Sequence, residues 1–164
     1  MPLNLRLLSS GCAVLAAIGL AAGAAAAHAV CLNENGVSGY QQPIEQETRD
    51  SVGIVAARVT GSVALQEDPA YPEGVTARLF QLQVDEVFKG RIPRRIEIRE
   101  ENDAGRFGLE VGAGYLLFLR PVTRGLSSDR IVPLFWVSPC GHSGLLGDRA
   151  EHLARLRKEL RSEP

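Results

Sequence analysis

The chain is poor in the residues from which most metal and redox sites are built. It has three cysteines and three histidines among its 164 residues. Cys31 and Cys140 have no second cysteine or histidine at zinc-ligand spacing, and the sequence contains no HExxH motif. The sequence therefore predicts no metal site, no cofactor and no zinc-protease activity.

The chain also lacks an excess of positive charge. Lysine and arginine number 18 against 19 aspartate and glutamate residues, which gives a net charge of −1. Such a chain does not attract nucleic acid or an anionic membrane surface. The basic residues around Lys89 and Arg91 are offset by acidic residues nearby in the sequence. No internal repeat, low-complexity tract or second domain is present.

Residues 1–29 have the pattern of a secretory signal peptide. Arg6 supplies the positive charge, residues 13–22 form an apolar run, and Ala27-His28-Ala29 forms a cleavage motif. The alternative is an uncleaved membrane anchor, which the Ala- and Gly-rich run and the cleavage motif disfavour. The sequence thus predicts a protein exported to the periplasm or the extracellular space. Its single mature domain, residues 30–164, has no membrane span.

Export bears directly on the cysteines. Cys12 leaves with the signal peptide, and Cys31 and Cys140 remain as an even pair in an oxidising compartment. We therefore expect a structural Cys31–Cys140 disulfide. It would close a loop of roughly 110 residues, for which the chain-entropy model gives about 4–5 kcal/mol.

A period-two pattern in residues 79–90 predicts a long strand with one buried face. Phe80, Leu82 and Val84 alternate with polar residues, and the phase slips after Asp85, so that Val87 becomes the next apolar position. An extra residue flips every later side chain to the other face. We therefore predict a one-residue bulge near residues 85–86.

Four further segments have strand patterns, at residues 52–65, 95–100, 115–119 and 130–137. The unbroken apolar run 115–119 indicates a strand buried on both faces. A helical turn is expected at 43–49. A terminal helix is expected from Asp148, which forms a capping box with Glu151, and it places Leu153, Leu156 and Leu160 on one face. This pattern predicts a mainly β fold, a five-stranded antiparallel OB-fold-like barrel with a C-terminal α-helix.

The order of short motifs along the chain resembles the netrin/TIMP-like (NTR-like) family. The motifs are VDEVFKG at 84–90, PxxIEI at 93–98, FxxxVGxGYLLFL at 107–119 and CGHS at 140–143, followed by the helix. This family comprises secreted OB-fold modules, among them the tissue inhibitors of metalloproteinases and many bacterial relatives. The resemblance covers residues 52–160 and implies the OB fold. It also implies a disulfide that matches Cys31 and Cys140, and a protein partner, which could be a protease.

The chain departs from the animal inhibitors at two places. Those proteins need a Cys-x-Cys start, whereas this chain has Ala29-Val30-Cys31, and Ala104 stands where the internal partner of the first cysteine would be. Metalloprotease inhibition through the N-terminus is therefore an alternative interpretation. In both interpretations Val30 and Cys31 are candidate contacts for a partner.

The aromatic pair Phe135-Trp136 supplies the best candidate binding residue. Neighbours on a strand point to opposite faces, so one of the two is expected in the core and the other on the surface. We therefore predict that Trp136 contacts a partner.

The stretch around Ser143 is the one place where the sequence suggests a catalytic nucleophile. Gly141-His142-Ser143-Gly144 is similar to the G-x-S-x-G elbow, but Leu145 stands in the fifth position and the α/β-hydrolase context is absent. We expect a strand-to-helix connection in which Ser143 caps a turn, and a surface or boundary position for His152. A small serine hydrolase is a further alternative. The prediction is a secreted or periplasmic, non-enzymatic protein-binding module with no catalytic residue.

Overall fold

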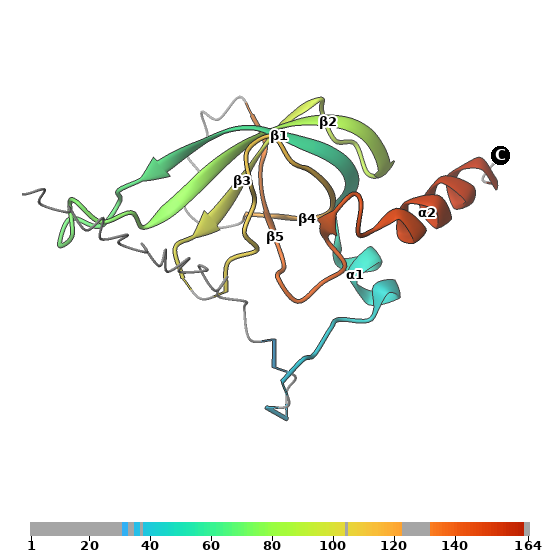
Figure 1. The fold of residues 1–164 in the computed structure, drawn as a ribbon, viewed down its shortest axis with the longest axis horizontal. Helices are drawn as coiled ribbons and strands as arrows, with labels where there is room; N and C mark the ends of the chain where they lie inside the picture. The colour runs from blue at the N-terminus through green and yellow to red at the C-terminus, as the bar shows by residue number, and fades with distance from the viewer. Residues whose placement is uncertain (1–30, 33–34, 37, 104, 123–131, 163–164) are drawn as a thin grey trace, which may run out of the picture.

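The computed structural model describes residues 31–162 except 33–34, 37, 104 and 123–131 (Figure 1). The predicted signal peptide and Val30 lie outside the described residues. The elements, in chain order, are α1 (Ile44–Asp50), β1 (Gly53–Leu65), β2 (Ala77–Lys89), β3 (Arg95–Glu101), β4 (Gly114–Pro121), β5 (Leu134–Val137), β6 (Gly144–Leu145) and α2 (Ala150–Ser162).

Five strands close into a barrel, which confirms the predicted OB-like fold. The hydrogen-bonded order is β1-β2-β3-β5-β4, and β4 pairs back to β1. The pairing differs from the expectation in one respect, because β3 and β5 run parallel while the other barrel pairs are antiparallel. The reason is topological. A closed ring with an odd number of strands cannot alternate direction at every step, so at least one neighbouring pair must be parallel.

The bulge predicted in the long strand is present at Asp85. Ala57 pairs with Val84 and Ala56 pairs with Glu86, which leaves Asp85 without a partner in β1. A second irregularity follows, since Val55 pairs with Val87 and Ile54 pairs with Lys89. Val87 consequently is 37 % exposed, whereas Phe88 is buried on the outer face of the barrel. The predicted shift in the strand register after Asp85 is confirmed, but the apolar residue buried after it is Phe88 and not Val87 as expected.

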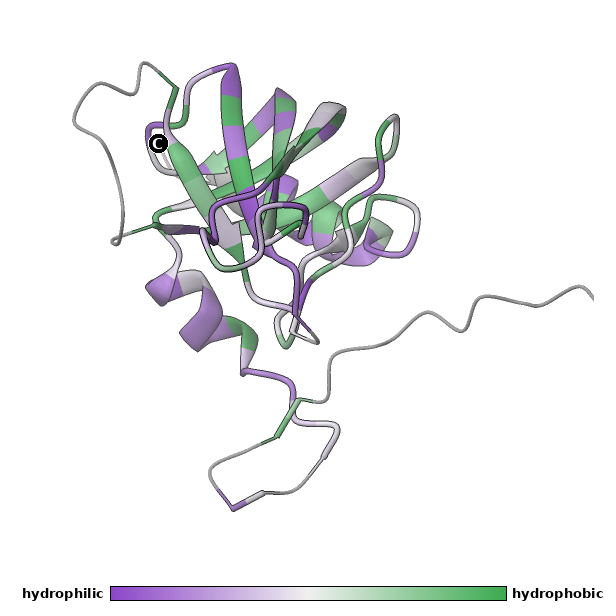
Figure 2. Cartoon of the chain, turned by 90° about the vertical axis from the view of Figure 1, so that its left-hand side faces the viewer, coloured by the Kyte–Doolittle hydropathy of each residue, from purple (hydrophilic) through white to green (hydrophobic). Residues whose placement is uncertain are grey.

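Two apolar clusters lie on opposite faces of the barrel wall. The inner cluster fills the barrel with alternate residues of all five strands, including Val55, Phe80, Ile98, Leu117 and Phe135. The outer cluster is Ile54, Ala56, Phe88, Leu116 and Phe118, covered by side chains from both helices. Strand β4 contributes to both clusters, as its unbroken apolar run predicts. Figure 2 shows the resulting hydrophobic and hydrophilic bands along the strands.

The two helices cover the outer cluster. Ile44 of α1 and Leu153 and Leu156 of α2 pack against it. Lys89 at the end of β2 donates hydrogen bonds to the carbonyl oxygens of Thr48, Arg49 and Ser51, and so caps α1 at its C-terminal end. Helix α2 begins at Ala150, two residues after Asp148, and the side chain of Leu160 lies outside the described residues.

Two further features complete the fold. The fifth strand starts at Leu134, while residues 130–131 of the predicted strand lie outside the described part of the chain. Among the described residues, no helix has the length and hydropathy needed to cross a membrane.

Candidate functional site

A cavity opens where β3 and β5 part from each other. These strands share only two register pairs, Glu97 with Leu134 and Ile98 with Phe135. Beyond them the described residues of β3 have no further partner in β5, and a cavity of about 700 Å³ lies there. We call it the β3–β5 groove; its lining includes Glu67, Arg99, Glu100, Glu101, Asp103, Arg106, Phe107, Leu134, Trp136 and Pro139.

Trp136 is the exposed aromatic residue of this groove. It is 38 % exposed, whereas its neighbour Phe135 is 8 % exposed and belongs to the inner cluster. This confirms the predicted division of the pair into a core and a surface residue. The guanidinium carbon of Arg120 on β4 lies 5.3 Å from the centroid of the indole ring, a cation–π distance.

Arg120 is itself held in position from two sides. Its Nη2 donates a 2.6 Å hydrogen bond to Oε1 of Gln42 and lies 3.7 Å from Oδ2 of Asp50. Gln42 in turn donates to the same carboxylate oxygen at 2.8 Å. The charge beside Trp136 is thus partly balanced by an acidic residue at the end of α1.

Arg99 on β3 is enclosed by two carboxylates. It donates to both oxygens of Glu67 at 2.9 and 2.6 Å, and to both oxygens of Glu101 at 2.7 and 3.3 Å. The hydrogen bonds to Glu67, and to a smaller extent those to Glu101, raise the pKa of the Arg99 guanidinium above its ordinary value. The group remains charged at any physiological pH, and it ties the β1–β2 loop to β3.

The loop between β3 and β4 is built around Glu100. This side chain is buried and accepts hydrogen bonds from the backbone amides of Gly108 and Leu109, at 2.9 and 3.3 Å. Burial raises the pKa of the Glu100 carboxyl, and the two amide hydrogen bonds oppose this rise. Asp103 accepts a 2.8 Å bond from the amide of Gly105, and Arg106 donates to Asn102 at 3.0 Å. One wall of the groove is therefore organised by short-range hydrogen bonds.

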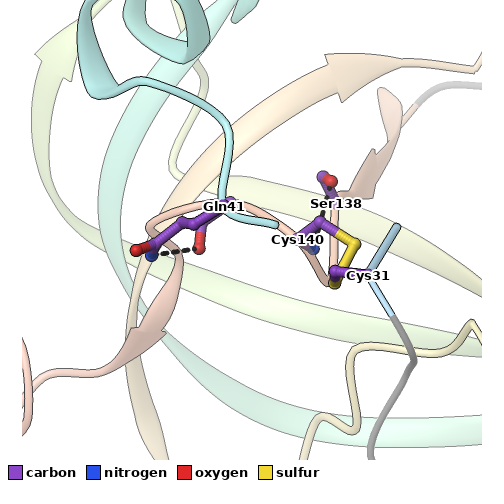
Figure 3. The surroundings of a disulfide bond; sticks show 5 residues. Cys31, Gln41, Ser138 and Cys140 are labelled. Atoms are coloured by element: carbon purple, nitrogen blue, oxygen red, sulfur yellow. Dashed lines mark hydrogen bonds between the residues drawn. A yellow bond between two sulfur atoms is a disulfide. The ribbon is translucent and has the colours of Figure 1, made fainter. Parts of the chain in front are cut away.

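The predicted disulfide joins the N-terminal segment to the end of β5 (Figure 3). Cys31 and Cys140 are bonded, with Cα atoms 5.5 Å apart. The side-chain amide of Gln41 donates to the carbonyl of Gly141 at 3.1 Å, and the amide of Gln42 donates to the carbonyl of Cys140 at 3.0 Å. Pro139, which precedes Cys140 in the chain, lines the groove. Of the predicted contact residues, Trp136 lines the groove and Cys31 is not among its lining residues.

Ser143 has a structural position. It is 4 % exposed, and its hydroxyl oxygen accepts a 2.9 Å hydrogen bond from the amide of Phe118 in β4. The prediction that Ser143 caps a turn is therefore replaced by a hydrogen bond between its hydroxyl and the backbone of strand β4. The adjacent His142 directs Nδ1 to Glu47, and the described contacts include no hydrogen bond between Ser143 and His142. This arrangement offers no exposed nucleophile and no base in contact with it.

A buried pair, Glu47 and His142, was missed from the sequence. Glu47 in α1 is 1 % exposed, and its Oε2 accepts hydrogen bonds from the amide of His142, at 2.6 Å, and pairs with Nδ1 of the same residue at 2.8 Å. The ring of His152 on α2 lies edge-on to that of His142, with centroids 5.4 Å apart. The two partners are 95 residues apart, and although His142 lies in the CGHS motif, nothing near Glu47 marks it as the partner, so no local signal could have identified the pair.

A metal would need more donors than this pair offers. Within the described part of the chain, no group of three histidine, cysteine, aspartate or glutamate side chains is placed to hold a metal ion. A second cavity of about 220 Å³ lies between α1 and α2, lined by Ile44, Thr48 and His152 among others. It is smaller and adjoins the outer cluster.

Comparison with known proteins adds no functional label. The sequence matches no protein-family model, and no curated protein is significantly similar to it. The resemblance to the netrin/TIMP-like family therefore stays a prediction from the motifs. Function must be argued from the site itself.

Proposed function

We propose that this chain is an exported, non-enzymatic protein-binding module that holds its partner in the β3–β5 groove, with Trp136 as the central contact. The carrying observation is an exposed tryptophan beside a cavity of about 700 Å³ on a rigid barrel. Tryptophan is enriched among the residues that dominate binding energy at protein interfaces. Cavities of this size are typical of binding sites.

The residues around Trp136 are positioned before any partner arrives. Phe135 anchors β5 in the inner cluster, and Arg120 is fixed by Gln42 and Asp50. Arg99 donates hydrogen bonds to Glu67, and Glu100 accepts hydrogen bonds from backbone amides of the following loop. A groove that is already ordered loses little conformational freedom on binding, which favours affinity.

The disulfide supports the exported location. Cys31–Cys140 is the kind of bond that persists in oxidising compartments and is rare in the reducing cytosol. The described residues contain no helix suited to span a membrane. The disulfide therefore supports a periplasmic or extracellular location.

The proposal is tested with a random-peptide display library selected against residues 31–164. Trp136 is the only tryptophan, so its emission reports directly on the groove. We expect selected peptides to shift this emission and to bind the Trp136→Ala variant at least about tenfold more weakly. Tyr71→Ala is the matched control, because Tyr71 is 73 % exposed and does not line the groove.

Two results would contradict the proposal. The first is a set of selected peptides that bind wild type and the Trp136→Ala variant equally well. The second is the recovery of no binder at all from repeated selections with folded protein. Circular dichroism of the variant shows that a loss of binding reflects the missing side chain and not unfolding.

A further inference from the structure

We infer that acidification releases helix α2 from a barrel that stays folded, because the helix is docked through a contact between the rings of His152 and His142. Such a release is independent of the β3–β5 groove and goes beyond the proposed function. The geometry of the two rings, the charges around them and the exposure of the remaining docking contacts all support it.

The two histidine rings connect α2 to the rest of the domain. The ring of His152 lies edge-on to that of His142, with an interplanar angle of 88° and centroids 5.4 Å apart. His142 is in turn fixed by Glu47 of α1, whose Oε2 lies 2.8 Å from its Nδ1, and its side chain is only 13 % exposed. Two protonated rings at this separation repel each other, and partial burial reduces the screening of that repulsion by water. The contact therefore favours a neutral His152.

The charged groups around His152 balance one another. They come from the start of α2, from α1 and from the loop before α2, and are Arg149, Glu151, Arg155, Glu45, Glu47 and His142. Glu47 is bonded to His142, and Arg149 donates a 3.1 Å hydrogen bond to the backbone carbonyl of the same residue. Burial is therefore the main influence, and it lowers the pKa of His152 below its ordinary value of 6.5; His142 and Arg149 lower it further.

The remaining docking of α2 rests on side chains that are partly buried or exposed. Figure 1 shows the helix on the outside of the barrel. Leu153 and Leu156 pack against the outer cluster, and both are only partly buried. Arg157 pairs with Glu86 of β2 at 2.7 Å, but both side chains are exposed, and such pairs contribute little to stability. A segment with few buried apolar contacts opens more readily than the core.

The barrel itself does not depend on α2. Its inner cluster contains no residue of α2 among the described side chains, and the ring of strands closes through the pairing of β4 with β1. The disulfide also lies outside the helix, since Cys140 precedes it. Release of α2 would therefore uncover the outer cluster, including Phe88 and Phe118, while the barrel stays closed.

The pH range of the release follows from the histidines. Residues 31–164 contain two of them, His142 and His152, and histidine is the side chain whose ordinary pKa lies between pH 5 and 8. Because docking lowers the pKa of His152, the docked state is favoured above about pH 6.5 and is lost as the pH falls from there through the lowered value.

Native-state hydrogen exchange of residues 31–164 tests the release. Protection is expressed relative to the intrinsic exchange rate at each pH, for wild type and His152→Gln at about pH 7.5 and 5.5. We expect amides of α2 to be at least about tenfold less protected than those of β1 and β4, and to lose about threefold or more of their protection in acid. In His152→Gln the protection of α2 should change less than about 1.5-fold between the two pH values.

Denaturant distinguishes release of the helix from unfolding of the whole domain. Low concentrations of urea should accelerate exchange in β1 and β4 and affect α2 only weakly, because an opening confined to α2 exposes little surface.

A second measurement does not depend on the His152→Gln variant. In a Leu153→Ala/Leu156→Ala double variant the helix loses both leucine contacts with the outer cluster. The pKa of His152, followed by nuclear magnetic resonance of its ring, should then rise toward 6.5. Lys158→Ala is the control, because Lys158 is an exposed residue of the same helix, and it should leave the titration of His152 unchanged.

Four results would overturn the inference. They are amides of α2 protected as strongly as those of β1, protection of α2 that does not change with pH, the same change in His152→Gln as in wild type, and an unaltered titration of His152 in the double leucine variant. None of them bears on the binding of peptides at Trp136, so the proposed function is tested separately.

Discussion

Oε2 of Glu47 lies 2.8 Å from Nδ1 of His142 and 2.6 Å from the backbone nitrogen of the same residue. The pair joins α1 to the loop that follows the disulfide, and both side chains are largely removed from solvent. Oε1 of Glu47 has no hydrogen-bond partner among the described residues. A single carboxylate oxygen of α1 therefore holds both the ring and the backbone amide of His142.

Replacing Glu47 by alanine should destabilise the domain by about 2–4 kcal/mol, because two donors of His142 would lose their acceptor inside the protein. Denaturant unfolding measures this change. Glu45→Ala is the control: Glu45 lies in the same helix but is exposed, and its loss should cost less than about 1 kcal/mol. Equal costs for the two variants would show that the pair does not anchor the helix.

Gly141 is required by the same pair. A Cβ at this position would overlap Oε1 of Glu47, and the buried carboxylate has no room to withdraw. Gly141→Ala should therefore cost about 2 kcal/mol or more, whereas Gly147→Ala, with no atom near its Cβ, should be close to neutral. Adding Glu47→Ala to Gly141→Ala should give a double variant less destabilised than the sum of the single variants. Additive costs would contradict the overlap.

The free energy of unfolding should decrease as the pH is lowered, because His152 takes up a proton more readily in the unfolded chain. Burial first, and then His142 and Arg149, lower the pKa of His152 below its ordinary value near 6.5, while Glu151 opposes this and Arg155 adds to it. His152 also borders a cavity that Glu45 of α1 lines. The unfolded chain thus binds a proton at a higher pH than the folded one. The contribution of neutral His152 to stability is fully present above about pH 6.5 and is lost as the pH falls from there through the lowered folded-state pKa.

Comparing thermal unfolding of wild type and His152→Gln between about pH 7.5 and 5 tests this. The glutamine variant lacks the titrating group, so the stability difference between the two proteins should change over this range in favour of the variant at low pH. A difference that stays constant with pH would contradict the assignment.

The disulfide should stabilise the domain substantially. It links residues 109 positions apart, and its removal in a Cys31→Ser/Cys140→Ser double variant should cost about 2–5 kcal/mol. Addition of a reductant should lower the stability of wild type toward that of the variant and leave the variant unchanged. Intact-mass analysis of residues 31–164 with thiol labelling should find no free thiol, and labelling of both cysteines would contradict the bond.

Local features of the fold were predictable because they depend on the pattern of apolar and polar residues within a single strand. The phase slip in β2 marks the bulge at Asp85, and the apolar run of β4 marks burial on both faces. The division of Phe135 and Trp136 into one core and one surface residue was predictable because strand neighbours alternate. Each of these inferences needs only residues within one strand.

Features that depend on distant residues were not predictable. The parallel pairing of β3 with β5 follows from ring closure, which is a property of all five strands together. The pairing of Arg99 with Glu67 spans 32 residues, and nothing in either segment marks its partner. The burial of Phe88 in place of Val87 depends on a second irregularity and on two helices that cover the outer face.

The bond between Cys31 and Cys140 has a practical consequence for every binding experiment proposed above. Pro139 borders the groove and Cys140 follows it in the chain, so the disulfide ties the N-terminal segment to a residue adjacent in sequence to the groove lining. An affinity tag or surface linker fused ahead of Cys31 would be anchored to the domain through this bond. Helix α2 packs on the outer cluster, on the other side of the barrel wall. Immobilisation through the C-terminus therefore attaches the domain through the helix that covers the outer cluster and leaves the disulfide-bonded segment unmodified.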